Sequence, residues 1–302
     1  MSDEATPAAA GQGRPLWLAA APVVFLLLWS GGYAVAKIGL EHAAPLTILC
    51  LRYALVVGIM GAAFVVLRPP LPKRAADWGH LALVGVLIQT VYFGMTYMAL
   101  LNGLSAGLAA IILSFQPILV ALIAPRWSGE PIRIATWIGL VLALAGAVTV
   151  IVARLDISPP PPLVFLLALL GLAGITGATL WEKRFGLSHH PVTANLIGYG
   201  AGLICLLPFW AVQDAAPVRW NWEFVWVMVY LVLGNSVIAV GLLLAMIRAG
   251  EVARVSALMF LVPPLAGLIA WATLGEVMPP LAWVGFALAG GGVYLATRRA
   301  RG

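Results

Sequence analysis

The sequence is poor in charge. Only 9% of its 302 residues are Asp, Glu, Lys or Arg, and 63% are hydrophobic. Soluble domains are about a quarter charged and about half apolar, so this composition excludes a soluble fold. The apolar residues instead form stretches long enough for helices that cross a lipid bilayer, which takes roughly 20 residues.

Ten such stretches follow one another, separated by short gaps that contain Gly, Pro or charge, as helix ends require. We therefore expect an all-α integral membrane protein. The ten predicted transmembrane helices cover about residues 17–38, 46–67, 80–101, 104–125, 134–153, 163–181, 192–212, 224–247, 252–274 and 277–297.

Acidic residues and histidines are missing from the interiors of these spans, because every Asp, Glu and His lies at a span end or outside one. Intramembrane proteases need paired carboxylates, metal ligands or a Ser–His pair at depth, so we expect no enzyme. The only cysteines, Cys50 and Cys205, are too few for a disulfide framework, and Cys/His metal spacing is absent. No phosphate-binding GxxxxGK[ST] motif occurs, which excludes ATP drive. We expect no nucleotide, cofactor or metal.

What the sequence does contain is an internal repeat, which fixes the architecture. At an offset of 146 residues, the separation of Glu130 and Glu276, further identical residues coincide: Lys37 with Lys183, Pro45 with Pro191, Tyr53 with Tyr199, Pro117 with Pro263, Trp137 with Trp283, Gly139 with Gly285, and Gly146 with Gly292. Each copy holds five spans, an odd number, so the second copy enters the membrane from the opposite face. We expect two inverted five-helix repeats, 17–153 and 163–297, joined by the Pro-rich linker 154–162. A duplicated scaffold without transport is the alternative interpretation.

Basic residues gather on one side of the predicted topology. That side takes Arg14, Arg68, Lys73, Arg74, Arg126, Arg133, Lys183, Arg184, Arg248, Arg254, Arg298, Arg299 and Arg301, whereas the other side has only Arg154 and Arg219. The positive-inside rule then predicts cytoplasmic N- and C-terminal tails, residues 1–16 and 298–302. The net charge of +6 is a topology signal and an attraction to anionic lipid headgroups, and it does not indicate nucleic-acid binding.

Several motifs resemble those of the drug/metabolite transporter superfamily, in its EamA-type branch. They are Trp29-Ser30-Gly31-Gly32-Tyr33-Ala34-Val35-Ala36-Lys37, Pro45, Arg52-Tyr53, and the run Pro117, Gly129-Glu130, Trp137-x-Gly139 with its copy at Pro263, Gly275-Glu276, Trp283-x-Gly285. The resemblance implies ten helices in two inverted halves and export of small metabolites through a central cavity. Within the branch the chain is similar to bacterial amino-acid exporters, including exporters of aromatic amino acids. The preference for Arg over Lys also suggests a bacterial protein, so we expect it in the inner membrane.

Polar and aromatic residues in mid-helix are candidates for a substrate site, since a polar group facing lipid is costly. Gln89 and Asn235 are repeat partners in the third and eighth spans, and Gln89, Tyr92, Phe93 and Thr96 share one helix face. We predict a site lined by Gln89, Tyr92, Thr96, Asn235, Trp29, Tyr33, Trp181, Ser114 and Gln116. Hydrogen bonding between helices and core packing are the alternative roles.

Two cations, Lys37 and Arg52, lie within spans but toward their predicted outer ends. Long basic side chains in such places can snorkel to the headgroups. The alternative is that both guide substrate carboxylates at the outer mouth.

These observations predict a secondary transporter that exports small organic metabolites, amino acids above all, by alternating access. Because no group that readily exchanges a proton lies at mid-depth, facilitated transport or exchange is expected. The expected partners are the small-molecule substrate and the lipid bilayer. The alternatives are a proton-coupled drug exporter, a membrane enzyme acting on lipid-linked substrates, and a sensor that does not transport.

Overall fold

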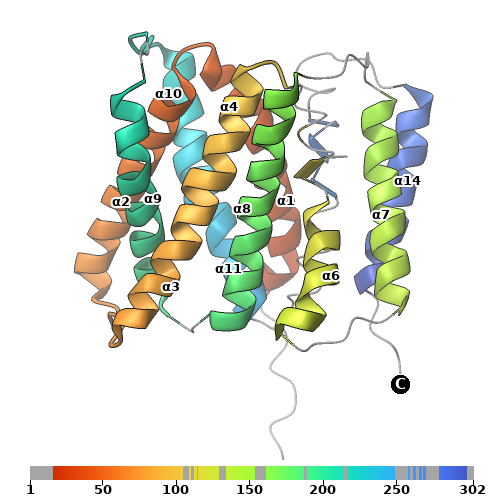
Figure 1. The fold of residues 1–302 in the computed structure, drawn as a ribbon, viewed down its shortest axis with the longest axis horizontal. Helices are drawn as coiled ribbons and strands as arrows, with labels where there is room; N and C mark the ends of the chain where they lie inside the picture. Colours follow the sequence, from red (N-terminus) through yellow and green to blue (C-terminus); the bar gives the residue numbers. More distant parts are fainter. Residues whose placement is uncertain are drawn as a thin grey trace, which may run out of the picture.

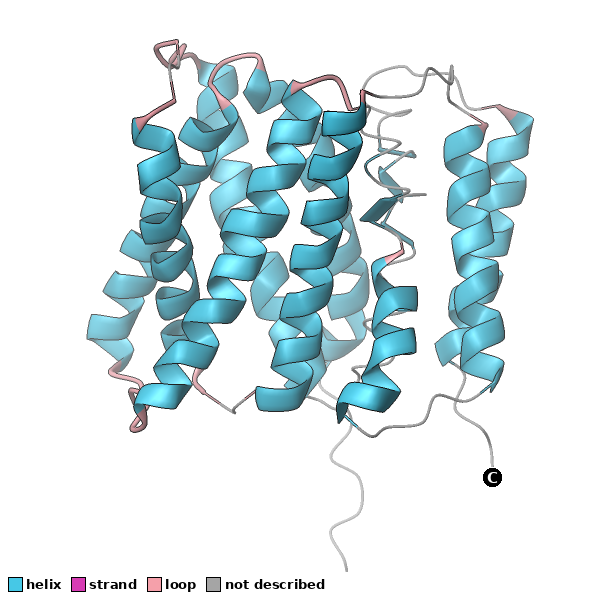
Figure 2. Ribbon diagram, in the orientation of Figure 1, coloured by secondary structure: helices cyan, strands magenta, loops and turns pink. Residues whose placement is uncertain are grey.

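A computed structural model of the chain describes residues 16–104, 109, 112–113, 115–128, 134–153, 161–186, 189–213, 216–248, 258, 261–262, 265–266, 268–269 and 279–297. Within these residues the regular structure is helical, with no strand (Figure 2). In this part of the chain, six helices are long and apolar enough to cross a membrane, and two shorter apolar helices cover 134–149 and 280–292. The prediction of an all-helical chain with membrane-length helices is confirmed.

The helices follow the predicted spans closely. They are α1 (Leu16–Leu40), α2 (Pro45–Leu67), a third span made of α3 (Ala75–Gly85), η1 (Val86–Gly94) and α4 (Met95–Leu101), α6 (Gln116–Ser128), α7 (Ile134–Val152), α8 (Pro162–Phe185), α9 (Pro191–Ala211), an eighth span made of α10 (Trp222–Val229), η2 (Tyr230–Ala239) and α11 (Val240–Arg248), and α14 (Pro280–Thr297). The predicted span 252–274 and the first part of 104–125 lie mostly outside the described residues.

Local sequence explains where these helices begin. Pro45, Pro162 and Pro191 each start a helix, at the position where the missing proline N–H costs no hydrogen bond. Asn221 caps α10, because its side-chain oxygen accepts a 2.8 Å hydrogen bond from the Phe224 N–H.

The outside of the bundle is apolar. Large hydrophobic side chains such as Leu27, Leu55, Val66, Ile138 and Trp283 are about half exposed or more. A soluble monomer rarely presents so much contiguous apolar surface. A lipid bilayer solvates it without cost, so the exterior fits the predicted membrane location.

Wide π-helical turns interrupt the third and eighth spans at matching places. They occupy η1, Val86–Gly94, and η2, Tyr230–Ala239. Shifting 86–94 by the repeat offset of 146 gives 232–240, which nearly coincides with η2. π-Helical turns are rare in proteins overall, and those that occur frequently lie at functional sites. The repeat partners Gln89 and Asn235 both lie in them.

The helices α7 and α14 lie side by side at one edge of the bundle (Figure 1). Glycine lets them approach closely, since a Cβ added to Gly146 or to Gly292 would collide with the facing helix. The atoms that it would meet belong to Gly285 and Ala289 for Gly146, and to Gly139 and Ala143 for Gly292. These contacts correspond pairwise under the 146-residue offset, so the interface is symmetric.

We expect Gly146→Ala and Gly292→Ala each to lower the melting temperature of the detergent-solubilised protein. Overpacking of this kind costs about 1–3 kcal/mol. Gly290→Ala is the matched control, because nothing lies within 4 Å of a Cβ added there. It should leave the melting temperature unchanged or raise it, since alanine favours a helix over glycine. Three variants that melt alike would contradict this account of the α7–α14 contact.

Candidate functional site

A cavity lies among α1, α2, the third span and the eighth span. Its lining residues are Trp29, Gly32, Ala36, Arg52, Tyr92, Phe93, Thr96, Tyr97, Leu231 and Asn235, and the space between them is narrow and open on one side. Most of the wall is aromatic or apolar, and within the part of the chain that the structure describes it contains no acidic residue. Arg52 follows the first residue of α2, Pro45, by seven positions, which places it roughly 10 Å inside the helix end.

Arg52 is the cation of this cavity, and its side chain is only 1% exposed. Its Nε–H donates to the Ser236 hydroxyl oxygen at 2.8 Å, and its Nη2 donates to the Asn235 side-chain oxygen at 2.7 Å. The guanidinium carbon lies 4.6 Å from the centre of the Phe93 ring. Arg52 is therefore buried and does not snorkel to the headgroups. Its predicted role at the outer mouth stays a prediction. The side chain turns inward because η2 and the third span offer it acceptors and an aromatic face.

The immediate partners of Arg52 are all neutral. Among the described residues no carboxylate forms an ion pair with it. The phenol groups of Tyr97 and Tyr199 also lie near the guanidinium. The chain thus holds a buried positive charge with dipoles and rings around it, which is an unusual state for an ion away from water.

Asn235 joins three helices at the cavity. Its side-chain oxygen accepts from Arg52 of α2, while its Nδ2 donates to the Leu28 carbonyl of α1 at 3.3 Å. The sequence permits this approach through Gly32, since a Cβ there would lie 2.6 Å from Asn235 Nδ2. The next residue, Ser236, donates in turn to the Leu231 carbonyl at 3.0 Å, one π-helical turn earlier.

Four predicted site residues come together in this cavity. Trp29, Tyr92, Thr96 and Asn235 line it, and each is at most 8% exposed. The Thr96 hydroxyl has no hydrogen-bond partner among the described residues and lies beside Gly171 of α8.

Other predicted site residues lie elsewhere. Gln89 is buried against Gly202 of α9, and its side-chain oxygen has no partner in the described part of the chain. Gln116 Nε2 donates to Thr179 of α8 at 2.9 Å, and Trp181 Nε1 donates to His80 at 3.2 Å. Lys37 is exposed. Ser114 and the side chain of Tyr33 lie outside the described residues.

The site predicted from the sequence did not include four residues that take part in it: Phe93, Tyr97, Gly32 and Ser236. Two of them could have been found, because Phe93 and Tyr97 are spaced i and i+4 on the third span and share its cavity face. The role of Ser236 had no sequence signal of its own. It depends on Arg52, which is 184 residues away along the chain.

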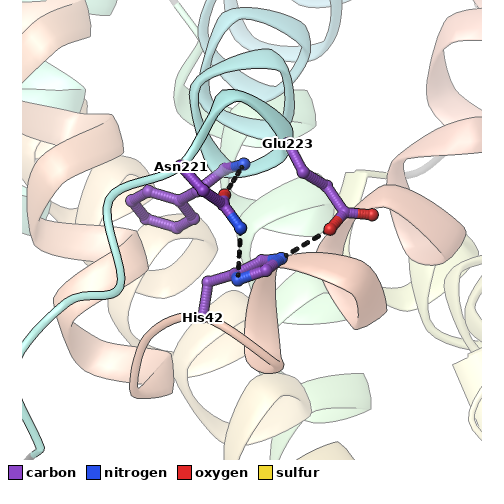
Figure 3. Close-up of polar contacts among 4 residues, drawn as sticks. His42, Asn221 and Glu223 are labelled. Atoms are coloured by element: carbon purple, nitrogen blue, oxygen red, sulfur yellow. Dashed lines mark hydrogen bonds and ion pairs between the residues drawn. The ribbon is translucent and has the colours of Figure 1, made fainter.

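Contacts between a histidine and a carboxylate join the helices at each end of the bundle. At the end where α10 begins, His42 Nε2 lies 3.0 Å from Glu223 Oε2, and Asn221 Nδ2 lies 3.4 Å from His42 Nδ1 (Figure 3). At the other end, His189 Nε2 lies 4.0 Å from Asp77 Oδ2. We call these the α10-end and α3-end contacts.

The two contacts correspond in the repeat. Glu223 is the partner of Asp77 at the offset of 146, and His189 is one residue beyond the partner of His42. Each contact connects the segment just before the second helix of one half to the start of the third helix of the other half.

Comparison with known proteins identifies the chain's relatives. The EamA-like transporter family matches it twice, over residues 16–152 and 162–298. A probable terminal-alkyne amino-acid exporter of Streptantibioticus cattleyicolor is 30% identical over 302 residues, covering 95% of this chain and 91% of that protein. A probable amino-acid metabolite efflux pump of Escherichia coli (strain K12) is 25% identical over 284 residues, covering 90% and 92%.

Two further similarities concern location and fold. An uncharacterized inner membrane transporter of Escherichia coli (strain K12) is 25% identical over 262 residues, covering 85% of this chain and 83% of that protein. A protein of known crystal structure has the same fold, with a TM-score of 0.76 and 21% identity, covering 94% of this chain and 97% of that one. The family resemblance predicted from the sequence is confirmed. Because the two family matches together span nearly all of its residues, the chain belongs to the EamA-like transporter family of the drug/metabolite transporter superfamily.

Proposed function

We propose that the protein is a secondary transporter that exports small organic solutes, amino acids above all, through the cavity around Arg52. The observation that carries this proposal is a buried cavity between helices of both halves, whose wall combines a cation, an amide and aromatic rings. The family match and the relatives named as an efflux pump and an exporter favour transport over an enzyme. The names of two relatives, which mention amino-acid export, support the substrate class.

We also propose the full architecture of ten helices in two inverted halves, with both termini cytoplasmic. The helix pairings support it. Under the 146-residue offset the contact of α1 with η2 corresponds to that of α8 with η1, and the contacts of α2 with α9 and of α7 with α14 each map onto themselves. The two successive family matches agree with a duplication. The orientation rests on the distribution of Lys and Arg and on the relatives' inner-membrane location.

Alternating access then requires the two ends of the bundle to open in turn. The α10-end and α3-end contacts are suitable for this, because each joins one half to the other at a different end. The contact is 3.0 Å long at the α10 end, the proposed outer face, and 4.0 Å long at the α3 end. We infer that each contact breaks when its own end opens.

Transport is expected to be facilitative or by exchange. A proton-coupled carrier alternates an ionisable group between charged and neutral states, and Arg52 does not release its proton at physiological pH. Purified protein in liposomes loaded with unlabelled amino acid should therefore accumulate labelled amino acid by counterflow with no pH gradient.

The same liposomes separate the alternatives. Concentrative uptake driven by a pH gradient alone, and abolished by an uncoupler, would show a proton-coupled exporter instead. Absence of flux for every solute tested, in protein that remains folded and monodisperse, would contradict a transport function. Empty liposomes and liposomes with heat-denatured protein are the controls.

A further inference from the structure

We propose that Arg52 binds the carboxylate of the substrate, so that the site selects monocarboxylates with an apolar or aromatic side chain and does not need their amino group. This inference rests on the proposed transport function and names the substrate class of the same cavity. It applies to amino acids and equally to their deaminated acids.

The guanidinium of Arg52 has donors to spare. Of its five N–H groups, one goes to Ser236 and one to Asn235, and the phenol groups of Tyr97 and Tyr199 lie near the guanidinium. The bonds through Nε and Nη2 hold one edge of the planar group, and the Phe93 ring lies against its face. The remaining edge, formed by Nη1 and the second Nη2 N–H, has the fork geometry that matches two carboxylate oxygens.

The charge of Arg52 also favours an anion. A buried cation has lost its hydration, and neutral partners replace only part of it. An incoming carboxylate would supply the missing counter-charge in a region of low dielectric constant, where the attraction between charges is strong.

The rest of the wall gives the amino group of a substrate little to bind. Its lining residues include no carboxylate, and the Asn235 oxygen already accepts from Arg52. What remains is aromatic and apolar, chiefly Trp29, Tyr92, Phe93 and Leu231. These side chains suit the hydrocarbon part of a substrate. Against these rings an ammonium group makes only cation–π contacts, which are weak where they are not desolvated.

Three ligands of the same shape test this in the wild-type protein. They are L-phenylalanine, L-phenylalaninamide, which lacks the carboxylate, and 3-phenylpropionate, which lacks the amine. We expect the two acids to raise the melting temperature of the purified protein and to compete with a labelled amino acid in liposomes. The amide should compete at least tenfold more weakly. An amide that binds as well as the amino acid, or an acid that fails without its amine, would overturn the inference.

Two substitutions separate binding from a structural role of Arg52. Asn235→Asp supplies a built-in carboxylate next to the guanidinium with almost unchanged shape. Aspartate cannot donate to the Leu28 carbonyl, but it gains an ion pair with Arg52, so we expect the variant to fold. We expect it to bind the acids at least tenfold more weakly, because its own carboxylate competes with them. A purely structural Arg52 would keep its ligand affinity, and that result would overturn the inference.

The second substitution, Arg52→Lys, keeps the charge and removes the fork, so affinity for the acids should also fall at least tenfold. Arg74→Lys makes the same change at an exposed residue and should have no effect. Unchanged affinity in folded Arg52→Lys protein would count against the inference. If Arg52→Lys protein does not fold, the comparison of the three ligands on the wild-type protein still tests the inference. If the acids stabilise the protein but no solute is transported, the result supports the anion site and contradicts the transport function.

Discussion

Replacing Asn235 with leucine is expected to lower the transport rate by about ten- to a hundredfold and to destabilise the protein. The change removes the acceptor of the 2.7 Å bond from Arg52 and the donor of the 3.3 Å bond to Leu28. Loss of a hydrogen bond to a buried charge costs about 1.5–3 kcal/mol, and each 1.4 kcal/mol of transition-state or binding free energy is a factor of ten. The measurements are counterflow in liposomes and the melting temperature in detergent.

Asn195→Leu is the matched control. Asn195 is an amide on a neighbouring helix, α9, and its Nδ2 donates to the Pro191 carbonyl of its own first turn at 3.0 Å. Losing that local bond should change the transport rate by less than about twofold. Equal losses in both variants would mean that the cavity position of Asn235 has no special role.

The repeat and the helix positions could be predicted because they depend on local pattern. Span length, prolines and glycines fix where a membrane helix begins and ends, and a fixed offset relates the halves. Details that were not predicted still follow this offset. The π-helical turns η1 and η2 nearly coincide under it, and so do the close contacts of Gly146 and Gly292.

The position of the Arg52 side chain could not be predicted from the sequence. Seven residues of helix separate it from Pro45, a depth at which a long basic side chain can either reach the headgroups or turn inward. The choice depends on acceptors presented by η2, whose Asn235 and Ser236 are 183 and 184 residues away. No local pattern contains that information.

The two predicted amides show where repeat reasoning fails. Gln89 and Asn235 are partners, yet only Asn235 lines the cavity. The reason lies in their neighbours. At the offset of 146, Arg52 and Val56 of α2 correspond to Gly198 and Gly202 of α9.

Those two glycines let α9 pack directly against the third span. This packing fills the position that corresponds to the Arg52 site in the other half. Gly198 meets the backbone of Gly85, and Gly202 meets the side chain of Gln89. In the other half, Arg52 takes the place of Gly198, and its side chain extends to the cavity instead. Among the described residues, the polar site around Arg52 therefore lies between α2 and the eighth span and is not repeated between α9 and the third span.

Linking the two sides of the α10-end contact covalently is expected to stop transport. In a background with Cys50→Ala and Cys205→Ala, the pair His42→Cys and Glu223→Cys would be joined by a short, cleavable reagent that reacts with two thiols. We expect counterflow to fall below about a tenth of its untreated value, because the cavity can no longer open at that end. Reductive cleavage of the reagent should restore the rate.

The α3-end contact tests the same mechanism independently. Joining Asp77→Cys to His189→Cys should also stop transport, although the two contacts lie at opposite ends of the bundle. Each single-cysteine variant, treated with the same reagent, controls for modification without a link. A carrier with one moving gate would be stopped by only one of the two links, and a channel that needs no closure would pass substrate through both. A protein whose ends must open in turn is stopped by either link and released by its cleavage, since each link removes one of the two states that every cycle visits.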